Sequence, residues 1–211
     1  LHYLGLLAHQ SDDDEEAIRL IGRAIEVAGP DPLRHYNLGE AYRAHGQPVE
    51  AARCYRATLA ADPDDGGAEL GLADSLYDMG ELKAALDHYR RARALLPEDP
   101  EVHNNLANAL LDRGDTEGAL AGFDRTLAVD PTFAEAHLNR ANALLGASRV
   151  DEALAAIDRY EKATPDPVKA DLARAACHQA KGDRECARAL LVRELERDPA
   201  NIQALSLLSR I

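Results

Sequence analysis

The stretch NNLANALL at residues 104–111 returns as LNRANALL at residues 138–145, 34 residues later. Alanine and leucine are strong helix formers, whereas asparagine is a weaker one because its amide competes for backbone hydrogen bonds. The repetition therefore indicates a helical element that is built more than once. Helix stability alone does not account for its asparagines.

Three further series of residues keep the same 34-residue spacing along the chain. A period of this length is the sequence signature of a repeat array, and it must be read before any local motif. The series are Pro63, Pro97, Pro131, Pro165 and Pro199; Gly46, Gly80, Gly114 and Gly182, with Ser148 in place of one glycine; and Ala17, Ala51, Ala85, Ala119, Ala153 and Ala187.

Each repeat reads as two helices joined by a short turn. In residues 100–133 we predict a first helix over about 100–113, a turn at Gly114 and Asp115, and a second helix over about 116–129. Proline breaks a helix because it lacks an N–H, glycine accepts a left-handed turn, and the small alanine lets the two helices approach closely. The complete repeats are 32–65, 66–99, 100–133, 134–167 and 168–201, preceded by a partial repeat (1–31) and followed by one first helix (202–211).

Composition and charge narrow the fold and the partners. The chain has two Phe, no Trp and few β-branched residues, which favours an all-α protein. Its formal net charge of −13 opposes binding to nucleic acid and to anionic membrane surfaces. The acidic run at residues 12–16 is typical of a helix start, where carboxylates complement the helix dipole.

The cysteines and the apolar segments bear on location. Cys54, Cys177 and Cys186 form neither an even set nor a C-x-x-C pair, which predicts reduced, mostly buried thiols and a cytoplasmic protein. No stretch approaches the roughly 18 apolar residues of a membrane span. Because the chain begins in the middle of the repeat pattern, we also expect it to be a piece of a longer polypeptide.

The repeat pattern closely resembles that of the tetratricopeptide-repeat family. Within that family it is most similar to the repeat arrays of bacterial O-GlcNAc-transferase-like proteins. The resemblance implies an all-α, right-handed superhelical solenoid over residues 1–211, with a concave groove lined by first helices. The matching residues are Leu38, Gly39, Tyr42, Gly46, Ala51, Tyr55 and Pro63 in one repeat, and Leu72, Ala73, Gly80, Ala85, Tyr89, Ala92 and Pro97 in the next.

Four residues depart from the family pattern. Arg140 and Arg174 stand where the pattern often has leucine, and Ile157 and Leu191 replace the aromatic residue of the second helix. We therefore expect less regular packing in the last two complete repeats.

The sequence offers no catalytic constellation and no metal-ligand spacing. No nucleophile stands beside a base in a recognisable motif, so we predict a protein that is not an enzyme and has no cofactor. His35, His103 and His137 share one place in their repeats, but equivalent places lie about 8–10 Å apart, whereas zinc ligands each lie about 2 Å from the metal. We predict that these histidines pack, and that no metal binds at Cys177, His178 and Cys186, because adjacent helical residues point to different faces.

The asparagines are the candidate binding residues. Asn37, Asn105 and Asn139 occupy the sixth place of their repeats, which resembles the asparagine series that holds peptide backbones in the groove of the O-linked N-acetylglucosamine transferase repeat domain. An amide pairs with both the C=O and the N–H of a peptide. Gly71 and Ala173 interrupt the series. The predicted groove residues are Asn37, Asn104, Asn105, Asn108, Asn139, Asn142 and Lys169, with Asn104 and Lys169 at the margins.

A second resemblance, to the carboxylate clamp of co-chaperone tetratricopeptide domains, is incomplete. Asn108, Asn139 and Lys169 match the clamp, whereas Asn104 and Ala173 replace two of its charged residues. A specific receptor for chaperone tails is therefore not favoured. The alternative for all these asparagines is that they are solvated groove residues with no ligand.

These patterns favour a non-catalytic scaffold that binds a peptide segment or a helix of another protein in its concave groove. One alternative is a substrate-docking arm of a larger enzyme such as a glycosyltransferase. Another is a structural scaffold that self-associates through the ends of the array, since the last helix carries apolar residues on more than one face. Those residues are Leu205, Leu207, Leu208 and Ile211.

Overall fold

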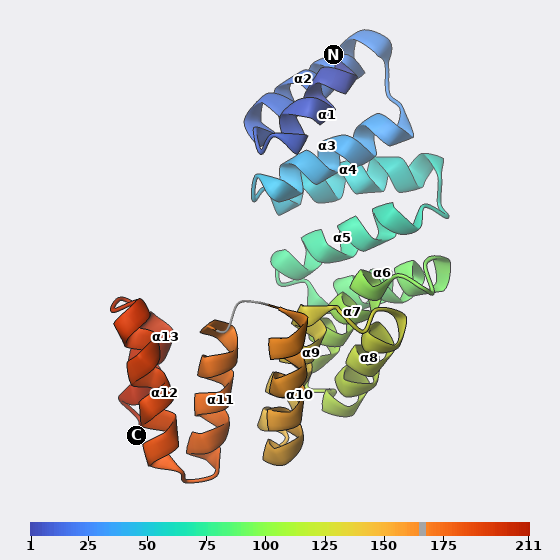
Figure 1. The fold of residues 1–211 in the computed structure, drawn as a ribbon. Coiled ribbons are helices and arrows are strands. Elements are labelled where there is room, and N and C mark those ends of the chain that lie inside the picture. Colours follow the sequence, from blue (N-terminus) through green and yellow to red (C-terminus); the bar gives the residue numbers. More distant parts are fainter. Residues whose placement is uncertain (165–167) are drawn as a thin grey trace. The chain divides into compact units, whose positions relative to one another are not determined.

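The computed structural model describes residues 1–164 and 168–211, and within them the chain forms thirteen α-helices and no strand (Figure 1). The chain forms two compact units, which we call the N-terminal unit (Leu1–Ala109) and the C-terminal unit (Leu110–Ile211). The all-α fold predicted from the sequence is confirmed.

The N-terminal unit contains three helix pairs and most of a seventh helix. Each helix packs on the next one from α1 to α6, and the first helices α3 and α5 also touch each other, so the pairs stack in chain order. The helices are α1 (His2–Gln10), α2 (Asp14–Ala28), α3 (Pro32–Ala44), α4 (Pro48–Ala61), α5 (Gly66–Asp78), α6 (Leu82–Leu95) and α7 (Pro100–Asp112).

The C-terminal unit follows the same plan. Each helix from α8 to α13 packs on the next, and the first helix α11 also touches both α9 and α13. The helices are α8 (Thr116–Val129), α9 (Ala134–Gly146), α10 (Val150–Ala163), α11 (Val168–Ala180), α12 (Arg184–Arg197) and α13 (Ile202–Leu208). The predicted bounds of the two helices of repeat 100–133 agree with α7 and α8 to within one residue.

Among the described residues, acidic or amide side chains begin seven of the helices. Each accepts a hydrogen bond from the backbone N–H three residues later, which satisfies a group that has no partner inside the helix. Asp13 does this for α2, with Asp14, Glu15 and Glu16 in the first turn, so the interpretation of the acidic run as a helix start is confirmed. The capping residues are Asp13, Asp31, Asp65, Asp99, Asp115, Asp183 and Asn201.

The turn between the two helices of a repeat uses a left-handed residue, as the glycine series predicts. Gly46, Gly80, Gly114 and Gly182 have φ between 74° and 86°. Ser148 and Asp12 take the same conformation at the equivalent place, with φ of 62° and 59°. Of the proline series, Pro165 lies outside the described residues, and the other four lie between helices.

The alanine series forms the contact between paired helices, because all six alanines have no exposed surface. The aromatic residues Tyr55, Tyr89 and Phe123 are also buried at their shared place in the second helices. Ile157 and Leu191, which replace the aromatic residue, are 0% exposed, so the expected loss of regular packing is not seen there.

The two unexpected arginines are accommodated by acidic residues of the preceding second helix. Arg140 Nε lies 2.7 Å from Asp124 Oδ1, and Arg174 Nη2 lies 2.9 Å from Asp158 Oδ1 and 2.8 Å from Glu161 Oε2. These pairs lie within the C-terminal unit, where they replace an apolar contact with ion pairs between neighbouring helices.

Two predictions concern the whole chain. Within residues 1–164 and 168–211, every helix is too short or too polar to cross a bilayer. The prediction of a single solenoid over residues 1–211 stays a prediction, since the chain divides into two compact units.

Candidate functional site

Polar side chains join neighbouring repeats within the N-terminal unit. Two tyrosines from second helices, two carboxylates and an arginine from first helices, and one asparagine of α7 are linked by hydrogen bonds and ion pairs. We call this the N-terminal polar network, and its members are Glu40, Arg43, Tyr55, Asp74, Tyr89 and Asn105.

Asp74 of α5 is the centre of the network. Its Oδ1 accepts hydrogen bonds from the Tyr89 hydroxyl at 2.6 Å and from Asn105 Nδ2 at 3.1 Å, and its Oδ2 lies 3.9 Å from Arg43 Nη1. Burial raises the pKa of Asp74 to about 6, although the hydrogen bond from Tyr89 and the charge of Arg43 act in the opposite direction. The carboxylate is therefore held in place by three groups from three different helices.

Glu40 of α3 repeats this arrangement one repeat earlier. The Tyr55 hydroxyl donates to its carboxylate, and Arg43 Nη2 donates to its Oε2 at 3.1 Å. Burial, followed by the negative charge of Glu40, raises the pKa of Tyr55 and keeps its hydroxyl protonated.

Tyr55 also explains why glycine interrupts the asparagine series. A Cβ atom at Gly71 would lie 2.4 Å from Cζ of Tyr55, which is closer than two non-bonded carbon atoms approach each other in a packed core. The sixth place of repeat 66–99 therefore has no room for any side chain while the Tyr55 ring lies over it. The sequence alone gave no reason for this gap.

Three of the predicted groove asparagines are engaged inside the N-terminal unit. Asn37 Nδ2 lies 3.0 Å from His2 Nε2, and Asn105 donates to Asp74. Asn104, which we predicted at the margin of the groove, is only 3% exposed and donates to Asn105 Oδ1 at 3.2 Å. Because it is buried, it can act on a ligand only by orienting Asn105.

Asn108, one turn beyond Asn105 on α7, is different. It is partly exposed, and in the part of the chain that the structure describes its side chain has no hydrogen-bond partner. Its amide is available to a ligand.

The C-terminal unit brings two predicted residues into one pocket. Asn139 of α9 and Lys169 of α11 line an open pocket of about 450 Å³ between neighbouring first helices. Asn142 lies one turn further along α9, exposed and without a side-chain partner among the described residues. The other lining residues are Ala134, Glu135, Leu138, Tyr160 and Thr164.

The histidines of the repeated place pack, as predicted. His103 and His137 are 7% and 6% exposed, and Nε2 of each ring lies 2.8 Å and 3.1 Å from the backbone oxygens of Pro97 and Pro131. His35 bonds in a similar way to the backbone oxygen of Asp31, through Nδ1 at 3.1 Å. Each ring ties the first helix to the segment before it.

Two buried carboxylates at this same place were not foreseen from the sequence. Glu69 is 4% exposed, and its Oε2 lies 2.5 Å from His88 Nδ1. Asp171 is 2% exposed and pairs with Arg193 and Arg197 of α12. Glu69 and Asp171 occupy the same place in their repeats as His35, His103 and His137. The sequence could have indicated from this that the place accepts a buried polar side chain that has a partner.

Comparison with known proteins places this architecture in a family. A family model described as "Tetratricopeptide repeat" matches residues 36–100 and 104–167, and a second model with that description matches residues 76–131. A search of curated protein sequences finds no match.

Several solved structures share the fold at low sequence identity. PilF of Pseudomonas aeruginosa is 19% identical, with a TM-score of 0.83 over 99% of this chain and 95% of its own. PilW, described as a widely conserved type IV pilus biogenesis factor, is 18% identical, with a TM-score of 0.89 over 98% and 96%. YrrB, described as a tetratricopeptide protein with an unusual peptide-binding site, is 20% identical, with a TM-score of 0.69 over 90% and 98%. Together with the matched models, the stacked 34-residue helix pairs show that this chain belongs to the tetratricopeptide-repeat family.

Proposed function

We propose that this chain is a non-catalytic protein-interaction module that binds an extended peptide segment along its first helices. The observation that carries the proposal is the pocket between α9 and α11, where Asn139 and Lys169 lie together beside the exposed amide of Asn142. An amide offers a donor and an acceptor to a peptide backbone, and the lysine adds a positive charge for an acidic group. The tetratricopeptide fold supports a role in protein interaction.

Asn108 offers a comparable amide within the N-terminal unit. The contrast with Asn105 supports the proposal, because an amide that already bonds to Asp74 is part of the scaffold, whereas an amide without a partner gains a hydrogen bond on binding. We therefore assign peptide contact to Asn108 and Asn142, and to Asn139 and Lys169 because they line the pocket between α9 and α11. Asn37, Asn104 and Asn105 take a supporting role.

The test uses the whole chain and a library of immobilised peptides. Each amide hydrogen bond contributes on the order of 1 kcal/mol, so the double variant Asn139→Ala/Asn142→Ala should weaken peptide binding by roughly 30-fold. Lys169→Ala should weaken binding most for acidic peptides. Lys162→Ala is the matched control, because it removes the same charge from the exposed surface of α10, outside the pocket.

Stability separates the two groups of asparagines. Asn142→Ala should leave the melting temperature unchanged or slightly raised, since alanine is the better helix former. Asn105→Ala should lower it, since it removes a donor to Asp74. Unchanged peptide binding by a folded Asn139→Ala/Asn142→Ala variant would mean that these amides are only solvated surface groups.

Self-association is a second candidate, favoured by one exposed apolar face. Tyr3, Leu4 and Leu7 of α1 are 84%, 57% and 59% exposed. At the other end, Leu207, Leu208 and Ile211 pack against a core cluster with Leu191, so of the four apolar residues expected on the last helix only Leu205 is largely exposed, at 47%. Ile202 of the same helix is 80% exposed. Large exposed apolar groups side by side favour association.

Sedimentation tests this second candidate directly. If α1 mediates association, the chain should show a concentration-dependent dimer that Tyr3→Glu/Leu7→Glu abolishes. A monomer at every concentration would exclude it. The role as a docking arm of a larger enzyme stays a prediction from the family resemblance alone, and at 18–19% identity the similarity to PilF and PilW supports the fold and no more.

A further inference from the structure

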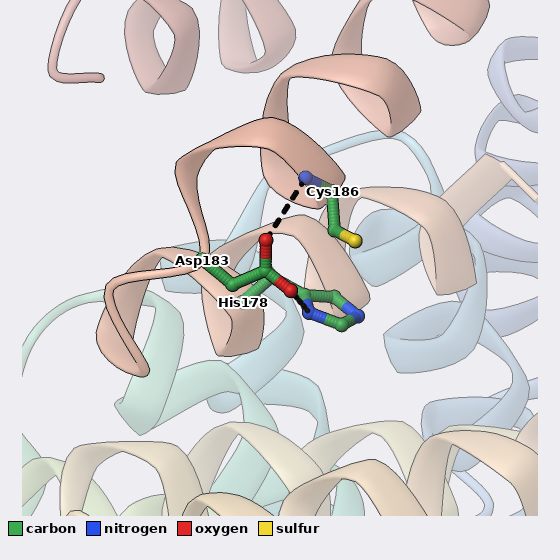
Figure 2. Close-up of side chains that lie close together, drawn as sticks. All are labelled: His178, Asp183 and Cys186. Carbon is green, nitrogen blue, oxygen red and sulfur yellow. Dashed lines mark hydrogen bonds and ion pairs between the residues drawn. The ribbon is translucent and has the colours of Figure 1, made fainter.

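Three side chains with metal-binding atoms converge in the C-terminal unit, where α11 ends and α12 begins. His178, Asp183 and Cys186 each place one potential ligand atom within 4.8 Å of the others (Figure 2). They belong to neither the pocket between α9 and α11 nor the core of the repeat.

The turn itself brings these residues together. His178 lies in the last turn of α11, Gly182 reverses the chain with a φ of 78°, and Asp183 begins α12. The two oxygens of Asp183 face in two directions: Oδ1 accepts a hydrogen bond from the backbone N–H of Cys186 at 3.2 Å, and Oδ2 lies 3.2 Å from His178 Nδ1. The carboxylate therefore fixes the imidazole relative to the start of α12.

The repeat provides an internal comparison that separates capping from any further role. Asp115 caps α8 in the same way, accepting from the backbone N–H of Gly118 at 3.0 Å. In that repeat Leu110 stands in place of His178, and Gly118 stands in place of Cys186. Helix capping thus accounts for the aspartate but requires neither the histidine nor the cysteine.

The other repeats confirm that these two residue types are particular to repeat 168–201. The place of His178 otherwise holds apolar or aromatic packing residues, and the place of Cys186 holds glutamate, alanine or glycine. The equivalents are Tyr42, Leu76, Leu110 and Leu144 for His178, and Glu50, Ala84, Gly118 and Glu152 for Cys186.

The separations are close to those of a zinc site. With zinc–ligand distances of about 2.0–2.3 Å, ligands at tetrahedral angles lie about 3.3–3.8 Å apart. His178 and Asp183 already lie 3.2 Å apart, and the Cys186 sulfur lies within 4.8 Å of both on an exposed side chain that can change rotamer. The side chains of His178 and Asp183 are 25% and 42% exposed, which leaves a path for an ion from solvent.

We propose that His178, Asp183 and Cys186 bind a zinc-class divalent transition-metal ion. A nitrogen, an oxygen and a sulfur ligand together suit zinc, whereas calcium and magnesium prefer oxygen ligands alone. Binding releases the thiol proton of Cys186 to solvent, so that one thiolate, one carboxylate and a neutral imidazole balance the double charge of the ion. Three protein ligands leave a fourth position open to water or to a side chain of a partner.

This proposal revises the sequence-based prediction that no metal binds here. That prediction considered Cys177 together with His178, and Cys177 is in fact 1% exposed and apart from the cluster. Asp183, which no sequence motif pointed to, supplies the third ligand.

The test titrates the reduced chain of residues 1–211 with zinc by calorimetry and with cobalt(II) by absorption spectroscopy. We expect one ion per chain and a thiolate-to-cobalt charge-transfer band. Cys186→Ser should abolish the band and weaken zinc binding at least about tenfold, since changes even outside the ligand shell of metal sites cost about 10–100-fold. His178→Leu restores the residue of the neighbouring repeats, so it should fold normally and weaken zinc binding to a similar extent.

Asp183→Asn is the sharpest variant, because asparagine caps a helix as well as aspartate does but supplies no negative charge. It should weaken zinc binding while leaving the melting temperature unchanged. Asp115→Asn makes the same change at the equivalent cap of α8 and should bind zinc like the unmodified chain. The proposal is overturned if the unmodified chain binds no zinc at one equivalent, or if the Cys186→Ser and Asp183→Asn variants bind it with unchanged affinity through other surface histidines.

Discussion

The Tyr89 hydroxyl donates a hydrogen bond of 2.6 Å to Asp74, and the same two places one repeat earlier hold Tyr55 and Glu40, joined in the same way. Repeats 100–133 and 134–167 have Phe123 and Ile157 at the tyrosine place, which carry no hydroxyl. At the carboxylate place the same repeats have asparagine, Asn108 and Asn142, neither with a side-chain partner among the described residues. In these two repeats no tyrosine hydroxyl is present to donate to the side chain at the carboxylate place. The amides of Asn108 and Asn142 are therefore available to a ligand.

Asp74→Asn should remove a pH dependence of stability. The pKa of Asp74 is raised from 3.8 to about 6, so the folded chain holds this proton more tightly than the unfolded chain does. The stability that this carboxyl contributes is therefore greatest when it is protonated, and it is lost as the pH rises from about 4 through 6. The free energy of unfolding of the unmodified chain, relative to that of the variant, should fall by up to about 3 kcal/mol between pH 4 and pH 7.

Denaturant unfolding at several pH values measures this difference. Asp78→Asn is the control, because it removes a carboxylate from the exposed surface of the same helix. Parallel pH profiles for the unmodified chain and Asp74→Asn would contradict the assignment of a raised pKa to Asp74.

Gly71→Ala should destabilise the N-terminal unit, although alanine is normally the better helix former. The added Cβ would meet the buried Tyr55 ring at 2.4 Å, and overpacking of this kind costs about 1–3 kcal/mol. Gly22→Ala in α2 is the matched control: its Cβ meets nothing within 4 Å, so it should stabilise the chain by up to about 1 kcal/mol. Thermal melting distinguishes the two, and equal shifts in the same direction would show that the Tyr55 ring moves aside without cost.

The sequence predicts the fold well because the residues that recur every 34 positions determine turns and helix ends through their own backbone chemistry, without contacts to other repeats. The spacing of Gly114 and Pro131 is sufficient to place α7 and α8 to within a residue, since a left-handed turn and a missing N–H act locally. The binding residues are predicted less well, because their availability depends on contacts between repeats. Asn105 and Asn108 look equivalent in sequence, and only the position of Asp74 makes one of them part of the scaffold.

Ser148→Gly should stabilise the C-terminal unit. Ser148 has a φ of 62°, and a left-handed residue with a Cβ costs about 1–2 kcal/mol, of which glycine's greater freedom in the unfolded chain offsets about 0.4–1 kcal/mol. A net gain of about 0.5–1 kcal/mol is expected. Gly114→Ser makes the reverse change at the equivalent turn and should lose a similar amount, as thermal or denaturant unfolding will show. If both variants were destabilised, the serine hydroxyl would have a role at its turn beyond backbone conformation.

Tyr89→Phe should destabilise the chain by about 2 kcal/mol at pH 7. The variant keeps the buried ring but removes a hydrogen bond to a carboxylate, and hydrogen bonds to charged groups contribute about 1.5–3 kcal/mol. Because the bond from Tyr89 lowers the pKa of Asp74, its removal should raise that pKa further, which NMR titration of the Asp74 carboxyl measures. Tyr3→Phe is the control, since the Tyr3 side chain is 84% exposed and its change should shift neither quantity.

A double-mutant cycle then decides whether the effect belongs to the pair. In an Asp74→Asn background the charge is absent, so Tyr89→Phe should cost only about 1 kcal/mol, the contribution of a neutral hydrogen bond. The difference of about 1 kcal/mol between the two backgrounds is the coupling between hydroxyl and carboxylate. Equal costs in both backgrounds, together with an unmoved Asp74 titration, would mean that Tyr89 stabilises the repeat through its ring alone and that the pairing of tyrosine with carboxylate along the array has no energetic basis.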